Sequence, residues 1–288
     1  MRWTPGGPSA DLEDERGSSG GRGFGGIGGV HIGIGGFIVL LLLSLVFHRN
    51  FFALLGVGGA PSGAPAGQTA PVNSSPQEDK EVQFVSFVLD DVQKTWEGIF
   101  AQNGQQYQHA KLVLFRDGIQ SGCGFAQTEM GPFYCPADKK VYIDLGFYKE
   151  LKDRFGASGD FAEAYVIAHE LGHHVQDLLG ISGKVERAQR QNPDEANALS
   201  VKLELQADCL AGVWGHSTQQ RNILEAGDVD EALNAASAVG DDRIQKQATG
   251  RVNPETWTHG SAQQRSHWFK TGFDSGSIQS CDTFSAGQ

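Results

Sequence analysis

The sequence has no excess of basic side chains, few cysteines and no CxxC pair. With 23 Lys and Arg against 34 Asp and Glu, the net charge is -11, so a basic face for the phosphate backbone of a nucleic acid is not expected. The missing CxxC pair excludes a zinc ribbon and a thioredoxin-like redox motif. No internal repeat is present. The composition, with 39% hydrophobic residues, predicts one globular core with appendages.

Glycine is plentiful, with 39 residues, and it dominates the start of the chain. Residues 1–29 are glycine-rich and polar, which predicts a disordered tail. Residues 30–49 contain the apolar run FIVLLLLSLVF, and no charged residue lies between Arg22 and Arg49. Because a helix of about 20 residues spans a bilayer core, we expect one transmembrane helix over 30–49. Residues 50–80, rich in Gly, Pro and Ala, are expected to form a flexible linker.

The charges around the expected span suggest its orientation. Arg2, Arg16 and Arg22 precede it, whereas Arg49 alone closely follows it, and this asymmetry favours a cytoplasmic N-terminus. All four cysteines then lie beyond the span, in the domain expected at 81–288. Outside the cytosol they could form two disulfides, although the sequence leaves three pairings open.

The domain at 81–288 is expected to be α+β and mostly helical, with a small sheet. Apolar residues recur at helical spacing from Val82 to Trp96. Short apolar runs predict three strands, and later periodic stretches predict five more helices. The strands are expected at 112–115, 133–135 and 141–145, and the helices at about 147–155, 160–179, 193–215, 229–247 and 260–271.

The segment His169-Glu170-Leu171-Gly172-His173 carries the strongest chemical signal. Residues four apart lie on the same face of a helix, so His169 and His173 can bind one metal ion. Glu170 lies about 100° further around the helix, where its carboxylate can reach a water at the metal without binding the ion. The segment therefore predicts a hydrolytic zinc site in which two histidines bind the metal and Glu170 is the general base.

A catalytic zinc takes three protein ligands and keeps one position open. Gln176 and Leu179 stand where a metzincin has glycine and histidine, which excludes that class. We predict Glu204 as the third ligand, with Glu195 as the alternative. Asp208, four residues after Glu204, is expected to accept the free ring N–H of a ligand histidine and so fix its orientation.

Two further roles can be assigned to candidates only. A developing oxyanion needs a hydrogen-bond donor, and the candidates are His259, Tyr142 and His216, of which we select His259 as catalytic. Its alternative is a surface histidine near a helix start. Zinc peptidases commonly bind substrate as a strand added to a sheet edge, so Val141, Tyr142 and Ile143 are the candidate substrate strand. An ordinary buried strand fits the same residues equally well.

Several stretches beyond the histidine motif match one known pattern: CG at 123–124, GPFYCP at 131–136, VYIDL at 141–145, AHELGHHVQ at 168–176, ELQADC at 204–209, AGVW at 211–214, GDDR at 240–243, THGS at 258–261, QR at 264–265 and CDTF at 281–284. On these residues the chain resembles a bacterial family of membrane-anchored neutral zinc metallopeptidases. The resemblance implies a zincin-like domain and one zinc ion bound by His169, His173 and Glu204, with Glu170 as base.

The four cysteines are expected to form two disulfides. Cys123 and Cys135 bracket a short loop and are expected to pair, which leaves Cys209 to pair with Cys281. The combined expectation is a single-pass protein of the bacterial inner membrane. Its catalytic domain would be periplasmic or extracellular and would act on a protein or peptide substrate.

Two other functions compete with peptide hydrolysis. One is a catalytically silent, zinc-stabilised scaffold or chaperone-like binding protein. The other is a zinc hydrolase of a different amide or ester, such as a peptidoglycan stem. The presence of Glu170 favours an enzyme over a scaffold, because a structural zinc site has no use for a base beside an open position.

Overall fold

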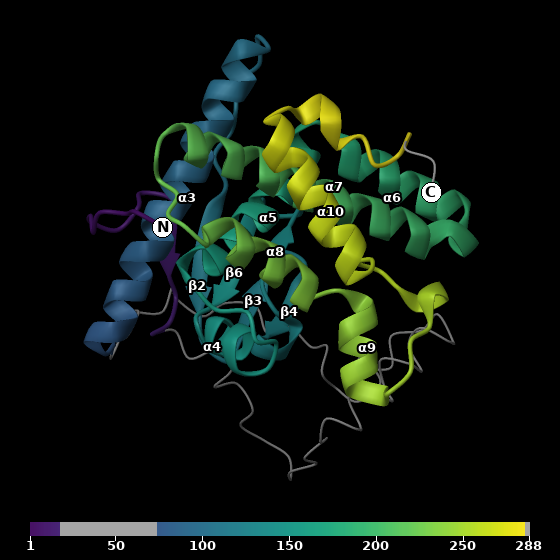
Figure 1. Ribbon diagram of the computed structural model, residues 1–288, viewed down its shortest axis with the longest axis horizontal. Coiled ribbons are helices and arrows are strands. Elements are labelled where there is room, and N and C mark those ends of the chain that lie inside the picture. The colour runs from purple at the N-terminus through teal and green to yellow at the C-terminus, as the bar shows by residue number, and fades with distance from the viewer. Residues whose placement is uncertain (18–73, 286–288) are drawn as a thin grey trace, which may run out of the picture. The chain divides into compact units, whose positions relative to one another are not determined.

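The computed structural model describes residues 1–17 and 74–285 (Figure 1). The transmembrane helix expected at 30–49 lies outside these residues, as does most of the linker expected at 50–80. Within the described ranges, no helix is both long and apolar enough to cross a membrane. The expected class is confirmed, because the domain is α+β and mostly helical with a small sheet.

A four-stranded sheet has the order β1-β2-β6-β5. β1 (Leu12–Asp14) pairs in parallel with β2 (Lys111–Phe115), and β2 pairs in parallel with β6 (Lys140–Asp144). β5 (Phe133–Cys135) pairs antiparallel with β6 and forms one edge of the sheet.

The predicted substrate strand is an interior strand. Val141, Tyr142 and Ile143 belong to β6, which is hydrogen-bonded to β2 on one side and to β5 on the other. A strand whose two edges are both paired has no free backbone groups for an added chain. The prediction is therefore wrong, and β5 is the edge beside β6.

Residues 1–17 do not follow the disorder expected for 1–29. β1 forms within this stretch and completes the sheet through β2. Trp3 packs edge-on against Phe84, with ring centroids 5.3 Å apart. Pairing with a strand a hundred positions away stabilises a segment whose own composition is polar and glycine-rich, so the tail prediction is wrong for residues 1–17.

The pairing of β1 with β2 also constrains membrane topology. β1 precedes and β2 follows the apolar segment expected to span the bilayer, and paired strands must lie on the same side of a membrane. A single crossing between residues 17 and 74 does not fit this sheet.

Among the described residues, the first helix begins at residue 76, inside the expected linker. The Ser75 hydroxyl accepts the Glu78 N–H at 3.2 Å, and the Glu78 carboxylate accepts the Ser75 N–H at 2.9 Å, which together form a capping box. The α-helices of the described ranges are α3 (Pro76–Gln102), α4 (Gly146–Asp153), α5 (Asp160–Leu178), α6 (Ile181–Gln191), α7 (Ala196–Gln220), α8 (Asp228–Ala238), α9 (Asp241–Thr249) and α10 (Ala262–Ser275).

One expected helix is divided in two. The stretch 229–247 forms α8 and α9, because the chain turns at Gly240 against the start of α10. A side chain at Gly240 would place its Cβ 2.3 Å from the backbone nitrogen of Ala262, so only glycine allows this approach. The helical periodicity of the segment does not reveal the contact, because it is made with a residue outside the segment.

α5 occupies the centre of the domain. It contacts α3, α7 and α8, and also β5 and β6 of the sheet (Figure 1). Gly172 on α5 faces α7, where an added Cβ would lie 3.0 Å from the carbonyl oxygen of Ala207. This glycine therefore brings the two helices that carry the motif residues close together.

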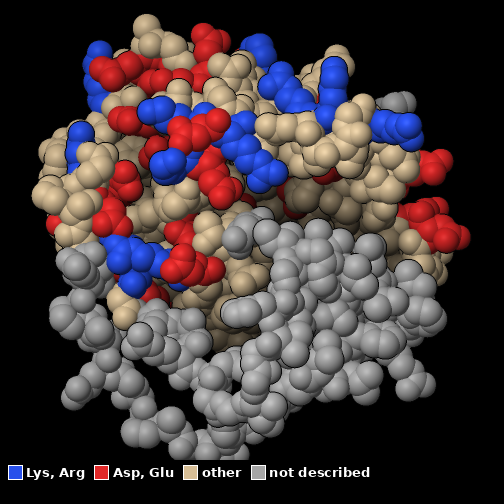
Figure 2. Space-filling view, turned by 90° about the horizontal axis from the view of Figure 1, so that it is seen from below, with Lys and Arg blue, Asp and Glu red and all other residues tan. Residues whose placement is uncertain are grey.

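Both predicted disulfides are present. Cys123 pairs with Cys135 and ties the loop between β3 (Gly118–Ser121) and β4 (Gly124–Gln127) to the edge strand β5. Cys209 pairs with Cys281 and ties the C-terminal segment to α7. On the face shown in Figure 2, acidic and basic side chains are interspersed over the described surface.

Candidate metal centre

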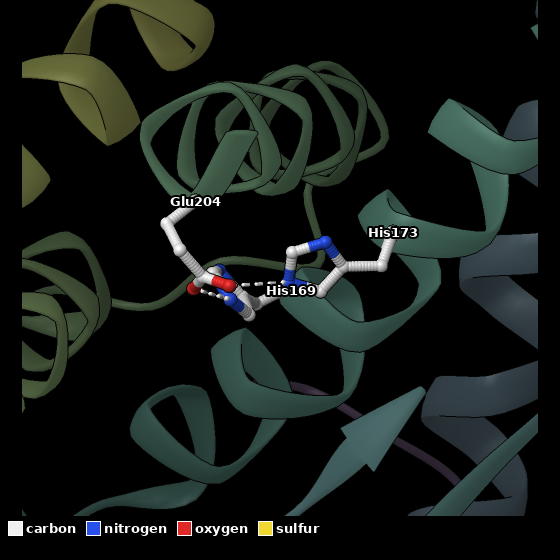
Figure 3. Close-up of side chains that lie close together, drawn as sticks. All are labelled: His169, His173 and Glu204. Carbon is white, nitrogen blue, oxygen red and sulfur yellow. Dashed lines mark hydrogen bonds and ion pairs between the residues drawn. The ribbon is translucent and has the colours of Figure 1, made fainter. Parts of the chain in front are cut away.

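His169 and His173 lie one turn apart on α5 and point toward Glu204 of α7 (Figure 3). The Nε2 atom of His169 is 3.2 Å from Oε2 of Glu204, and the Nε2 atom of His173 is 3.3 Å from Oε1. The ligand atoms of the three residues all lie within 4.8 Å of one another. The structure thus brings together the three residues predicted as metal ligands.

The alternative third ligand is elsewhere. Glu195 is exposed in the short 3-10 turn Pro193–Glu195 that precedes α7. Among the described residues, the group able to hold a metal contains Glu204 and does not include Glu195. The difference follows from position, because Glu195 lies in the turn before α7, whereas Glu204 lies within α7, about one turn before Ala207, which packs against Gly172.

A buried carboxylate orients the first histidine. Oδ1 of Asp208 lies 2.8 Å from Nδ1 of His169. The neighbouring cations Arg265 and His169 overcome the effect of burial and lower the pKa of Asp208, so its carboxylate can only accept. Nδ1 of His169 therefore carries the proton, and Nε2 is directed toward Glu204, as the sequence predicts.

A buried amide orients the second histidine in the same way. Oε1 of Gln176 lies 2.9 Å from Nδ1 of His173. The Gln176 amide nitrogen donates to the Leu203 carbonyl at 2.7 Å and to Oε1 of Gln206 at 3.1 Å. These two bonds fix the amide with its oxygen toward His173, so the residue that excludes the metzincin class also positions a ligand.

A buried cation stands behind Asp208. The Arg265 guanidinium donates from Nε to Oδ2 of Asp208 at 2.8 Å and from one terminal nitrogen to Oδ1 at 3.0 Å. The Tyr165 hydroxyl donates to Oδ1 as well. Sequence reasoning gave no role to Arg265 or Tyr165. The one signal was that Arg265 belongs to a stretch shared with the resembling family.

The charge of the site is arranged for a cation. Burial raises the pKa of Glu204, but the imidazole of His173 and the hydrogen bonds from both histidines outweigh it and bring this pKa well below its usual range. Burial lowers the pKa of His169, yet Asp208 and Glu204 raise it to about 10. These carboxylates therefore favour the protonated ring of His169 in the metal-free site, and binding of a metal ion would release that proton.

A cavity of about 530 Å³ opens at this centre and is lined by both histidines, Glu204 and Glu170. Glu170 is 7% exposed, and no other described residue hydrogen-bonds its carboxylate. That carboxylate is thus available to a molecule in the cavity, as the predicted general base requires.

Of the three oxyanion candidates, only His259 lines the cavity. Nδ1 of His259 lies 3.2 Å from Oδ1 of Asp241. The Tyr142 hydroxyl instead donates to Asp138 at 2.7 Å, and Nδ1 of His216 pairs with the backbone carbonyl of Phe273 at 2.7 Å. Neither Tyr142 nor His216 borders the cavity.

His174 directly follows the motif, but its ring contacts the sheet rather than the metal ligands. Its Nε2 lies 2.6 Å from the Gln108 carbonyl and its Nδ1 3.1 Å from the Tyr134 hydroxyl. Burial lowers the pKa of His174, which favours the neutral ring. This buried histidine holds the edge strand β5 against α5, next to the metal ligands.

Comparison with known proteins decides the family. The family model described as "Putative neutral zinc metallopeptidase" matches residues 1–284. The chain belongs to this family. It is 51% identical over 287 residues to "Uncharacterized protein YpfJ" of Escherichia coli strain K12, and the match covers 99% of each chain.

A more distant relative covers less of the chain. "Uncharacterized protein Rv2575" of Mycobacterium tuberculosis strain H37Rv is 50% identical over 191 residues, which are 62% of this chain and 64% of that protein. No solved structure matches the chain significantly. The family resemblance inferred from the motifs is therefore confirmed.

The residues present fit the zinc that the family description names. Two imidazole nitrogens and one carboxylate are a common donor set of catalytic zinc, which keeps a fourth position open. His169, His173 and Glu204 supply that set, and the cavity lies on their open side. Asp208 and Gln176 supply the outer hydrogen bonds that ligand histidines usually receive.

Proposed function

We propose that this member of the zinc metallopeptidase family hydrolyses peptide bonds, with one zinc ion held by His169, His173 and Glu204. The observation that carries the proposal is the placement of Glu170, a base without a protein partner among the described residues, in the same cavity as the three ligands. A zinc ion bound there would lower the pKa of a water to about 7 and polarise the scissile carbonyl.

The chain's own residues supply the proton transfers. Glu170 would accept the proton of the attacking water and then deliver it to the leaving amine. His259 would donate a hydrogen bond to the developing oxyanion from Nε2, since Nδ1 is held by Asp241. Asp208 and Gln176 keep the two ligand histidines from rotating while the substrate changes shape.

The substrate backbone would lie along β5. This strand is an edge of the sheet, and its residues Phe133 and Tyr134 line the cavity. His174 holds Tyr134 against α5, so a substrate strand added to β5 would be kept in a fixed position relative to the metal ligands. In this proposal β5 replaces the interior strand β6 as the strand that pairs with the substrate.

Replacing Asp241 with Asn is expected to move the alkaline limb of the pH profile of kcat/KM to lower pH. The hydrogen bond that Nδ1 of His259 donates to Asp241 raises the pKa of His259. His259 thus keeps its proton, and its strength as a donor, until pH rises through that pKa. In the variant the proton is lost at lower pH.

The matched control is Asp242→Asn. Asp242 is the next residue on α9, and its carboxylate accepts the Ala262 N–H at 2.7 Å without contacting His259. The alkaline limb of the pH profile of the Asp242→Asn variant should coincide with that of the wild type. An unshifted limb in Asp241→Asn would rule out His259 as the donor.

The proposed activity is tested with an unfolded protein as substrate. Zinc-loaded enzyme is incubated with it, and the products are identified by mass spectrometry with and without a chelator. New peptides that disappear with the chelator are expected. Bound zinc with an intact substrate would instead favour the scaffold, and cleavage of a peptidoglycan stem alone would favour the other hydrolase.

We propose further that the domain faces an oxidising compartment, the periplasm or the cell exterior. Support comes from the cysteines, all four of which are in disulfides. Because β1 and β2 share one sheet, a chain attached to the inner membrane would have to return to the side it left. Alkylation of protein isolated without reductant should find no free thiol, and four free thiols would contradict the placement.

A further inference from the structure

The cavity is lined by two chemically different groups of residues. Beside the polar metal ligands, apolar residues from separate elements form walls. Phe147 of α4, Val166 of α5, Ile244 of α9 and the connecting residues Phe155 and Val239 form these walls. Phe147 and Val166 are buried and the other three are partly buried, so the walls are built into the domain.

The charged residues at the wall do not give it a net charge. Glu150 and Arg154 also line the cavity, and their charges are opposite. The Arg154 guanidinium lies over the Phe155 ring, 5.2 Å from its centroid, where it covers apolar surface. The two opposite charges add no net charge to this part of the lining.

One exposed apolar side chain borders the cavity. Three large apolar side chains are well exposed among the described residues, namely Phe125, Met130 and Val252, and of these Met130 alone is in the lining. Met130 borders the cavity and lies just before the edge strand β5. Exposed apolar groups at a site mark contact with an apolar partner, which here would be a substrate chain on its way into the cavity.

Helix geometry gives the apolar wall a position relative to the chemistry. Val166 and Glu170 are four residues apart on α5 and so lie on the same face, one turn from each other. Glu170 is the residue that would return a proton to the leaving amine. The substrate residue that carries this amine is therefore placed next to Val166 and the apolar wall.

We propose that this cavity binds a bulky apolar side chain, of the Phe, Leu or Met class, on the substrate residue that supplies the leaving amine. This inference rests on the proposed peptide hydrolysis and names its substrate class. A carboxylate or ammonium at that position would lose hydration against the apolar walls, and the lining offers it no net opposite charge, so we expect the walls to select against charge.

Cleavage-site mapping tests the preference. Zinc-loaded enzyme is given a peptide library that varies only at the residue after the scissile bond, and kcat/KM is measured for each member. Phe, Leu and Met are expected to exceed Asp and Lys by about 100-fold, the scale that apolar pockets reach. Equal rates for all members would overturn the inference while leaving peptide hydrolysis in place.

Ile244→Asp tests the wall itself. Ile244 is partly exposed on α9, so the change adds a charge to the cavity without opening the core. We expect kcat/KM for the Phe peptide to fall about 10- to 100-fold, with the Lys peptide losing much less. Val252→Asp, at an exposed apolar residue outside the cavity lining, should behave as wild type. Equal losses for Phe and Lys peptides in Ile244→Asp would contradict the inference.

Binding separates the inference from the proposed activity. The Glu170→Gln variant, loaded with zinc, is titrated with the fluorescently labelled Phe and Asp peptides. Tighter binding of the Phe peptide, lost in Glu170→Gln/Ile244→Asp, supports the apolar pocket even if the wild type cleaves no peptide. Equal affinities for the two peptides would reject the pocket even if the wild type cleaves both.

Discussion

Glu170→Gln is expected to lower kcat by about 10²–10⁴-fold, the usual contribution of a general base, while the protein still binds one zinc per chain. Gln has nearly the same shape as Glu but cannot take a proton. Because Glu170 lies beside the predicted ligands rather than among them, the metal should stay. The measurement pairs zinc content by elemental analysis with peptide cleavage on the same preparation.

The control for this variant is Glu163→Gln on the same helix. Burial and the carboxylates of Glu81, Asp160 and Glu231 raise the pKa of Glu163 to about 7, and this residue does not line the cavity. The Glu163→Gln variant should cleave peptides at the wild-type rate. Loss of zinc in Glu170→Gln would show that the carboxylate is a ligand, and unchanged turnover would remove its role as base.

Arg265→Met is expected to reduce the free energy of unfolding by about 3–5 kcal/mol, the cost of leaving a buried charge without its partner. Asp208 is completely buried and would lose the two charge-assisted bonds from Arg265. Met approximates the length and apolar stem of Arg, so packing changes little. Urea unfolding in the presence of a chelator measures the effect without a contribution from bound metal.

Two comparisons isolate the charge. Arg190→Met breaks an exposed pair with Glu186 and should change stability by less than about 1 kcal/mol. Asp208→Asn combined with Arg265→Met removes both charges and should recover part of the loss. A loss in Arg265→Met as small as that in Arg190→Met would show that Arg265 does not balance Asp208.

Most of the candidate site could be predicted because it depends on helix periodicity. His169 and His173 share a face of α5, and Glu204 and Asp208 share a face of α7, at a spacing visible in the sequence. What brings the two faces together is Gly172, which the sequence shows but whose contact with α7 it does not.

The rest of the site depends on contacts between distant segments. Gln176 was expected only to exclude a class, and its role at His173 depends on the positions of Leu203 and Gln206. Arg265 lies 57 positions from Asp208, and no local pattern connects them. Long-range contacts of this kind are set by packing and leave no periodicity in the sequence.

The fold likewise has features that local sequence patterns predict and features that depend on long-range contacts. The mostly helical class followed from local patterns and the Cys123–Cys135 pairing from a short loop, whereas Cys209–Cys281 was the pair that remained. Composition predicted disorder for residues 1–17, and β1 forms there because β2 offers a partner. Likewise the interior place of β6 follows from the strand order, which no single strand encodes.

The central claim is that one zinc ion at His169, His173 and Glu204 makes this chain a hydrolase. Its most direct test is to titrate zinc into metal-free protein while measuring peptide cleavage. Wild type and Glu195→Ala should gain activity linearly up to one equivalent of zinc, whereas Glu204→Ala should need far more zinc and remain nearly inactive. Cleavage by the metal-free protein, or full activity of Glu204→Ala at one equivalent, would contradict the account.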